Sequence, residues 1–128
     1  MLRYIEKENK KLGFKYKNYY LPQGDSFSLT ATEKGAEGME LISRVVFKLG
    51  LNETECKINP IFEQDYRKDE NGVWTLVVRG VDTEKWKPTC ACGDEPYVYE
   101  IEAYFSDGEP VTLTSGAFTI ETQIGGSL

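Results

Sequence analysis

Apolar and polar residues alternate with a period of two along much of this chain, and this alternation limits the available folds more than any other feature. The clearest run is residues 26–32, in which Phe27, Leu29 and Ala31 share one face. Successive side chains of a strand point to opposite faces, so such a run predicts a strand with one buried face. No long amphipathic helical pattern competes with it. The sequence therefore predicts an all-β protein.

Two further runs repeat the alternation. Residues 41–49 turn Arg44 and Lys48 outward, and the opposite, core face carries Leu41, Ser43, Val45, Phe47 and Leu49. The alternation continues over residues 56–62 with Cys56, Ile58, Pro60 and Phe62. Pro60 predicts an edge position for this strand, because proline cannot donate a hydrogen bond to a neighbouring strand.

Turn signals predict a hairpin and a short helix next. Asn71 and Gly72 are a strong turn signal, and the β-branched and aromatic run that follows predicts a hairpin from about 60 to 79. Before Pro88, residues 82–86 have the pattern of a single helical turn, with Asp82 or Thr83 as the N-cap. Trp86 would anchor this turn across one end of the sheet.

The C-terminal third returns to strands. One face of residues 97–105 should be core and carries Tyr97, Tyr99, Ile101, Ala103 and Phe105. The other face carries Glu100 and Glu102, a spacing typical of the wet face of an antiparallel strand. A turn at 106–109 leads into two closing strands, which are interrupted at Ser115 and Gly116 and carry Val111, Leu113, Phe118 and Ile120. About seven or eight short strands at this spacing predict a β-sandwich or a barrel.

The 128 residues have the length of one domain that can build its own core. Residues 18–124 would form this domain. Residues 1–17 are rich in Lys and Glu and predict an arm or edge segment, either a solvated tail or a docking element for a partner chain. Residues 125–128 predict a flexible tail. The expected core is made of Phe27, Leu29, Val45, Phe47, Leu76, Tyr99, Ile101, Phe118 and Ile120.

Charge disfavours two classes of partner. The net charge of −6 opposes attraction to the phosphates of nucleic acid and to anionic lipid surfaces. No stretch approaches the roughly 20 apolar residues that span a bilayer, and the charged start lacks the apolar core of a signal peptide. We therefore expect neither nucleic-acid nor membrane partners, and synthesis in the cytoplasm.

The residues for most enzymatic mechanisms are missing. The chain has no His, the commonest general base and the usual partner of a Ser or Cys nucleophile. Glu100 and Glu102 have a spacing that a glycosidase could use, but the wet face of a strand explains them better. No glycine motif that would hold a nucleotide phosphate is present. We expect a protein that is not an enzyme and has no cofactor.

The cysteines Cys56, Cys90 and Cys92 do not predict a metal site. Structural zinc usually takes four Cys or His ligands, and this chain has three Cys and no His. An odd number of cysteines also argues against a disulfide framework. We expect free thiols and no stoichiometric metal in the monomer.

Aromatic side chains are the feature that could support binding, by stacking on sugars or packing on a partner protein. The candidates are Tyr19, Tyr20, Trp74, Trp86 and Tyr104, most of which we expect to be core or sheet-face packing instead. Tyr104 lies opposite the core face of its strand and is the best candidate for an exposed contact. Tyr19, Tyr20 and Trp86 are the others that we retain as candidate contacts to a partner or glycan.

Three parts of the sequence together resemble the immunoglobulin-like β-sandwich modules of phage tails, similar to the N-terminal domain of baseplate upper proteins. They are the run from Gln23 to Phe27; Asp82 and Thr83 with an apolar residue four along; and the stretch from Tyr97 to Ile101 followed by Asp107, Gly108, Thr112, Leu113, Gly116, Phe118, Thr119 and Ile120. The likeness covers about residues 19–122, and departs from the family at the Cys-rich stretch 89–95.

The resemblance implies an immunoglobulin-like antiparallel β-sandwich of about seven to eight strands. It also implies a structural protein of a phage or prophage virion, in the tail or baseplate, whose partners are other virion or tail proteins and which could form a homo-oligomer. A carbohydrate-binding or adhesin-like module is the alternative that the aromatic residues favour.

Overall fold

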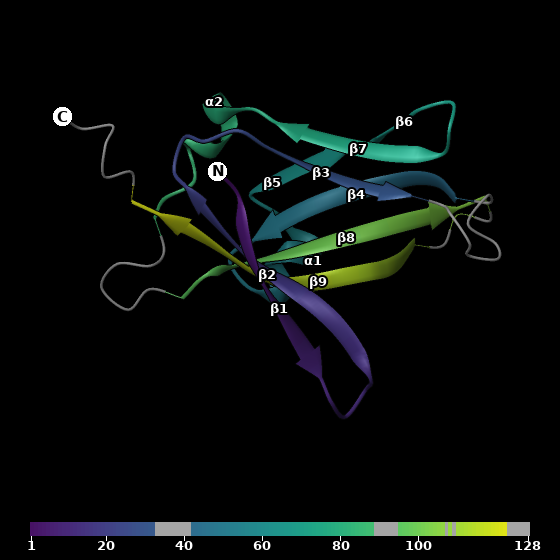
Figure 1. The fold of residues 1–128 in the computed structure, drawn as a ribbon, viewed down its shortest axis with the longest axis horizontal. Helices are drawn as coiled ribbons and strands as arrows, with labels where there is room; N and C mark the ends of the chain where they lie inside the picture. Colours follow the sequence, from purple (N-terminus) through teal and green to yellow (C-terminus); the bar gives the residue numbers. More distant parts are fainter. Residues whose placement is uncertain (33–41, 89–94, 107, 109, 123–128) are drawn as a thin grey trace.

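A computed structural model describes residues 1–32, 42–88, 95–106, 108 and 110–122 (Figure 1). In these residues the chain forms nine strands and two short helices. The strands are β1 (Arg3–Asn9), β2 (Phe14–Pro22), β3 (Phe27–Thr32), β4 (Ile42–Gly50), β5 (Phe62–Asp65), β6 (Arg67–Lys68), β7 (Val73–Val78), β8 (Tyr97–Phe105) and β9 (Pro110–Glu121). The helices are α1 (Glu53–Ile58) and α2 (Gly80–Thr83).

The strands form two sheets, which confirms the all-β prediction. Six strands pair in the order β1-β2-β9-β8-β4-β5, and three pair in the order β3-β7-β6. Strands β2 and β9 are parallel, and the other pairs are antiparallel. The predicted arm, residues 1–17, contributes β1 and the first part of β2, and β1 is an edge strand of the larger sheet. The predicted tail, residues 125–128, lies outside the described residues.

One apolar cluster joins the two sheets. Phe118 of β9 is fully buried, and its ring centre lies 5.5 Å from that of Phe27 in the smaller sheet and 6.1 Å from that of Phe47 in the larger one. Eight of the nine expected core residues are buried, and Leu29 is partly buried against the same cluster. The strand faces predicted from the alternation are therefore confirmed for β3 and β8.

The strand predicted over residues 56–62 is wrong at its beginning, because residues 53–58 form α1. The side chain of Asn52 caps this helix, and its Oδ1 accepts a hydrogen bond of 2.8 Å from the backbone N–H of Glu55. Glu53 and Glu55 also lie in the first turn, where carboxylates favour a helix. Cys56 is buried by the helix, whereas Ile58 is exposed. Pro60 precedes β5, which is the other edge strand of the larger sheet.

The predicted hairpin over 60–79 is correct only near its turn. Asp69 Oδ1 accepts hydrogen bonds from the backbone N–H groups of Asn71 (2.8 Å) and Val73 (3.0 Å), and β6 pairs with β7 across this turn. The first arm, however, divides between the sheets, since β5 pairs with β4. Tyr66 lies between β5 and β6, where the chain crosses from the larger sheet to the smaller one. Its side chain is buried in the core at this point, which explains why the predicted arm is split between the sheets.

The two closing strands predicted around Ser115 and Gly116 form one continuous strand, β9. Gly116 is needed for a close approach, because an added Cβ would lie 2.6 Å from the carbonyl oxygen of Lys17. The irregularity in pairing lies instead beside Leu113, between the pairs Ile101 with Thr114 and Glu102 with Thr112. Val111 and Leu113 are exposed, whereas Phe118 and Ile120 are buried.

Two smaller predictions also change. An irregularity between Ile42 and Arg44 shifts the register of β4, so Ile42 is buried and Ser43, predicted to face the core, is exposed. The helical turn begins at Gly80 with Arg79 as its N-cap, earlier than the predicted Asp82 or Thr83. Trp86 is buried as the predicted anchor. No helix in the described part of the chain has the length and apolar character needed to cross a membrane.

Truncating a large side chain in the core between the sheets should destabilise the protein strongly. We expect Phe47→Ala to lower the free energy of unfolding by about 3–5 kcal/mol and Ile101→Ala by about 2–5 kcal/mol, because each leaves a cavity between the sheets. Val111→Ala, at a side chain that is 47% exposed, is the control and should change it by less than about 0.5 kcal/mol. Urea midpoints measure all three, and core variants that unfold at the wild-type midpoint would contradict these strand faces.

Candidate binding groove and the buried acid and lysine network

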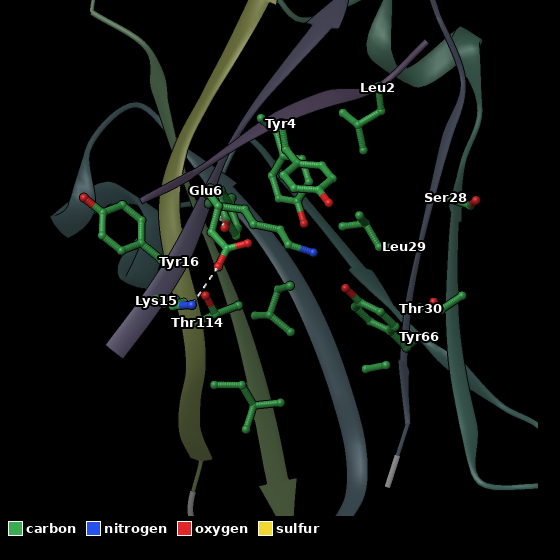
Figure 2. Close-up of a pocket in the computed structure, with 16 residues that line it drawn as sticks. Leu2, Tyr4, Glu6, Lys15, Tyr16, Ser28, Leu29, Thr30, Tyr66 and Thr114 are labelled. Carbon is green, nitrogen blue, oxygen red and sulfur yellow. Dashed lines mark hydrogen bonds and ion pairs between the residues drawn. The ribbon is translucent and has the colours of Figure 1, made fainter. Parts of the chain in front are cut away.

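An open groove of about 580 Å³ lies between the β1–β2 hairpin and strand β3 (Figure 2). It exists because β2 pairs with β9 only over residues 19–22 and 118–121, so the earlier parts of these strands have no ladder between them. Strand β3 is the edge of the smaller sheet on the other side of the groove. The groove therefore opens onto the core between the two sheets.

Tyrosines are the commonest residue type in the lining of the groove. Tyr19, Tyr66 and Tyr99 belong to the core cluster and line the groove as well, and Tyr4 of β1 joins them with its ring centre 6.2 Å from that of Tyr19. The hydroxyl of Tyr99 donates a hydrogen bond of 2.6 Å to the carbonyl oxygen of Lys17. Burial raises the pKa of Tyr19 and of Tyr66 above the ordinary value, and that of Tyr99 to about 12. These three hydroxyls therefore stay protonated at neutral pH.

Charged side chains lie only on the hairpin side of the groove. The ammonium of Lys17 lies 4.4 Å from the ring centre of Tyr4, a cation–π contact. Lys15 Nζ lies 3.8 Å from Glu6 Oε1. The opposite wall, on β3, is uncharged and consists of Leu29 and Ala31 together with Ser28 and Thr30. The groove offers aromatic faces, hydroxyls and two lysines, a set suited to binding a sugar or an extended peptide.

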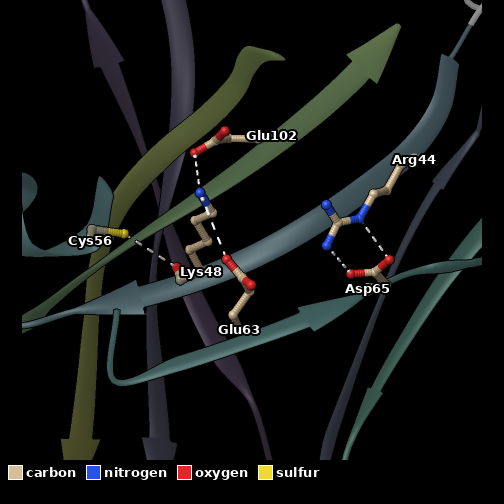
Figure 3. A network of polar contacts seen from close by, with 6 residues as sticks. All are labelled: Arg44, Lys48, Cys56, Glu63, Asp65 and Glu102. Atoms are coloured by element: carbon tan, nitrogen blue, oxygen red, sulfur yellow. Dashed lines mark hydrogen bonds and ion pairs between the residues drawn. The ribbon is translucent and has the colours of Figure 1, made fainter. Parts of the chain in front are cut away.

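A second cluster of polar groups lies on the outer face of the larger sheet, and Figure 3 shows Lys48, Glu63 and Glu102, which belong to it. Glu100 and Glu102 of β8 were expected on a wet face, but they are only 2% and 7% exposed. Helix α1 packs over β4 and β8 and covers them. Gly50 permits this packing, since an added Cβ would lie 2.4 Å from Cα of Cys56. The wet-face prediction is therefore wrong, because the alternation does not reveal the helix above.

Lysines neutralise both buried carboxylates. Lys48 Nζ lies 3.2 Å from Glu102 Oε1 and 3.8 Å from Glu63 Oε1, and Lys57 Nζ lies 3.0 Å from Glu100 Oε1. Burial alone would lower the pKa of Lys48, but the hydrogen bond and the charge of Glu102 raise it. Glu100 Oε2 is buried and has no hydrogen-bond partner within the described ranges. The network ties α1 to the sheet, and each carboxylate already has a cation beside it.

Cys56 lies under the same helix. It is fully buried, and its thiol donates a hydrogen bond of 3.6 Å to the carbonyl oxygen of Lys48. Burial, followed by the nearby charge of Glu100, raises the pKa of the thiol to about 12. No group of three His, Cys, Asp or Glu residues that could hold a metal ion occurs in the described part of the chain. Cys90 and Cys92 lie outside it.

The aromatic residues singled out from the sequence fall into two groups. Tyr19, Trp74 and Trp86 are only 7%, 5% and 4% exposed, so the ring faces that a partner contact would need are packed in the core. Tyr20 and Tyr104 are half-buried and each lies beneath a guanidinium, 5.8 Å from Arg3 and 5.1 Å from Arg44 respectively. The structure brings Tyr19 into the groove but leaves the other four elsewhere.

Sequence reasoning missed Tyr4 and Tyr66 as groove residues. Tyr4 lies in the Lys- and Glu-rich segment that the sequence predicts as an arm or edge segment, and no strand face is assigned within it. No local pattern marks Tyr66, since it lies between two short strands of different sheets. No protein-family model matches this chain, and a search of the curated proteins found no match either.

Cys56 should be unreactive in the folded protein. Thiolate is the reactive form, and a pKa of about 12 leaves almost none of it at pH 8. We expect a thiol reagent to modify Cys56 only after urea is added, as read by peptide mass spectrometry, which separates it from Cys90 and Cys92. Modification of Cys56 without denaturant would show that α1 does not stay packed on the sheet.

The raised pKa of the Cys56 thiol makes the stability of the protein depend on pH above about 9. The unfolded chain ionises this thiol near its ordinary pKa of 9.0, whereas the folded chain holds its proton until about 12. The stabilising contribution is therefore complete below about pH 9 and declines as the pH rises towards 12. A Cys56→Ala variant should lose less stability than the wild type over this interval, and equal losses would contradict the shift.

Proposed function

We propose that this chain is a non-enzymatic structural protein of a phage or prophage virion, which acts as an assembly or adaptor module of the tail or baseplate through protein–protein contacts. The observation that carries the proposal is the β1–β2 hairpin. It projects from the body of the molecule (Figure 1) and exposes large apolar side chains, namely Tyr4 (54%), Ile5 (49%), Leu12 (73%) and Phe14 (46%). An exposed apolar surface on an edge strand is a common feature of protein contact sites.

The virion assignment is supported by the resemblance to immunoglobulin-like modules of phage tails. Two of the three sequence parts that carry it are in contact in the fold. The hydroxyl of Thr83 donates a hydrogen bond of 2.8 Å to the carbonyl oxygen of Asp25, and Gln23 Nε2 donates one of 2.8 Å to that of Glu84. These contacts give the quoted residues a shared structural role in this chain.

A non-enzymatic role agrees with the chemistry of the side chains. The chain has no His, and the two glutamates with a spacing that a hydrolase could use are covered by α1 and paired with lysines. A general acid or nucleophile must reach its substrate, and these carboxylates do not. The groove contributes tyrosines and lysines, which suit recognition.

The virion assignment predicts that the chain is present in purified particles. Particles induced from a bacterium that carries the gene should contain its peptides after density-gradient purification, as detected by mass spectrometry. A cytoplasmic protein of similar abundance serves as the control for contamination. Gene deletion should leave particles without complete tails. Peptides found in the cell extract but absent from intact particles would rule out a virion component.

Carbohydrate binding is the second candidate, and the tyrosine groove favours it. Tyr4 presents a half-exposed ring at the groove beside the buried Tyr19 and Tyr66, and aromatic faces of this kind stack on sugars. Lys15 and Lys17 could hydrogen-bond to sugar hydroxyls or pair with an acidic sugar. The occupied groove would hold the glycan between β3 and the hairpin.

Tyr4→Ala tests this candidate, because it removes an exposed ring without opening the core. We expect any glycan identified on an array to bind the variant about tenfold more weakly in calorimetry. Ile5→Ala is the matched control, since Ile5 is the next residue of β1 and points to the opposite face of the sheet. An array without binding above background, or equal losses for both variants, would remove the candidate.

A further inference from the structure

Charge is distributed unevenly between the hairpin and the rest of the chain. Residues 1–22 carry six Lys and Arg and two Glu, a net charge of +4, whereas residues 23–128 carry nine Lys and Arg and nineteen Asp and Glu, a net charge of −10. The basic part is thus the same hairpin that exposes Ile5, Leu12 and Phe14. A basic, apolar hairpin on an acidic body is complementary to another copy of the same body.

The two edges of the larger sheet carry opposite charges on the same face. On β1, Arg3 and Lys7 point away from the core, because Tyr4 between them pairs with the buried Tyr19. On β5, at the other edge, Glu63 and Asp65 point away from the core, because Phe62 packs against it. Bringing one edge against the other in a continuous sheet therefore sets basic side chains beside acidic ones.

An apolar hollow lies next to the acidic edge. It has a volume of about 460 Å³, and its apolar part is lined by Leu51, Ile61, Phe62 and Trp86. The rest of the lining is Asp82, Lys85, Lys87 and Tyr97. Leu51 and Ile61 are 60% and 44% exposed. If β1 of another copy ran antiparallel to β5, its C-terminal end would lie near Phe62, and the hairpin tip with Leu12 and Phe14 would lie beside this hollow.

We propose that the β1–β2 hairpin of one copy of this chain docks on the β5 edge and its adjacent hollow in a second copy. The hairpin supplies Lys7 and the apolar tip, and the acceptor supplies Glu63. The side chain of Glu63 is 46% exposed, and its ion pair with Lys48 is long, at 3.8 Å. Arg3 and Asp65 add opposite charges, although each already pairs within its own chain, with Glu121 and Arg44. This inference rests on the proposed role in assembly and names the partner.

Symmetric pairing of two β1 strands is disfavoured by their charges. In an antiparallel pair, opposite residues share a face of the sheet. In a symmetric pair of β1 strands, an odd-numbered residue of one copy would therefore lie opposite an odd-numbered residue of the other, and the same holds for even-numbered residues. A pair centred on Ile5 sets Arg3 against Lys7, one centred on Glu6 sets Glu6 against itself, and one centred on Lys7 sets Glu6 against Glu8. Like charges directly opposite destabilise such a pair. These three registers are therefore disfavoured by charge, whereas the hairpin is complementary in charge to the opposite edge of the sheet.

The contact is head-to-tail, because donor and acceptor lie at opposite edges of one sheet. Each copy that accepts a hairpin still presents its own, so assembly continues until a ring closes or a filament forms. The wild-type protein should therefore show a mass that rises with concentration from about 2 to about 200 µM in sedimentation velocity. Added salt should reduce this mass, since the attraction between exposed charges is screened.

Two charge-reversal variants test the pairing of unlike surfaces. Lys7→Glu removes the donor charge, Glu63→Lys removes the acceptor charge, and each alone should weaken self-association about tenfold or more. Mixed in equal amounts, they should associate again, because the intact hairpin of Glu63→Lys meets the intact edge of Lys7→Glu, and the two reversed surfaces also carry opposite charges. Lys68→Glu is the control for Lys7→Glu, since it makes the same change of charge at an exposed residue of β6, in the smaller sheet and outside the lining of the hollow. Leu12→Asp repeats the donor test through the apolar tip, and circular dichroism confirms that each variant is folded.

A wild-type protein that stays monomeric to the highest concentration would overturn the self-contact. Self-association that persists in both variants, or a mixture that stays monomeric, would overturn the pairing of these two surfaces. Failure here is distinct from failure of the virion role. Peptides in purified particles together with a monomeric protein would mean that the hairpin meets a different virion protein, and the self-contact would then be wrong while the assembly role stands.

Discussion

The fold depends on one aromatic ring that both sheets share. Phe118 is fully buried, and its ring centre lies between 5.5 and 6.3 Å from those of Tyr19, Phe27, Phe47, Trp86 and Tyr99. These five residues come from three strands of the larger sheet, from β3 of the smaller sheet, and from the segment after α2. Aromatic pairs of this geometry contribute about 0.5–1.5 kcal/mol beyond the area that they bury. Each sheet therefore depends on the other to exclude water from this cluster.

The two faces of the larger sheet are covered by different means. The inner face meets the smaller sheet through apolar contacts, and the outer face of β4 and β8 lies beneath α1, which brings Lys57 to Glu100. A single turn and a half of helix is too short to be stable alone. Its position depends on the Asn52 cap, on the close approach at Gly50, and on the ion pairs beneath it. The buried polar groups thus stabilise a packing arrangement, and each of the two buried carboxylates is paired with a lysine.

The features that bear on function follow from the limited pairing of β2 with β9. Because these strands share a ladder only near their ends, the hairpin extends past the sheet and the groove opens between it and β3. The hairpin then exposes its apolar and basic residues, and the groove exposes tyrosines of the core cluster. The groove and the exposed hairpin thus both result from the limited pairing of β2 with β9.

The sequence by itself determined the all-β class, most strand faces and most of the core, because a period of two reports directly which side chains share a side of a strand. It could not distinguish a strand from a capped helix over residues 53–58, since six residues are too few to define a period. It also gave no sign that Glu100 and Glu102 lie under a helix, or that Tyr4 and Tyr66 meet in one groove. Those outcomes depend on which strands become neighbours and what packs above them. Such contacts join residues far apart in the chain, so only the tertiary structure decided them.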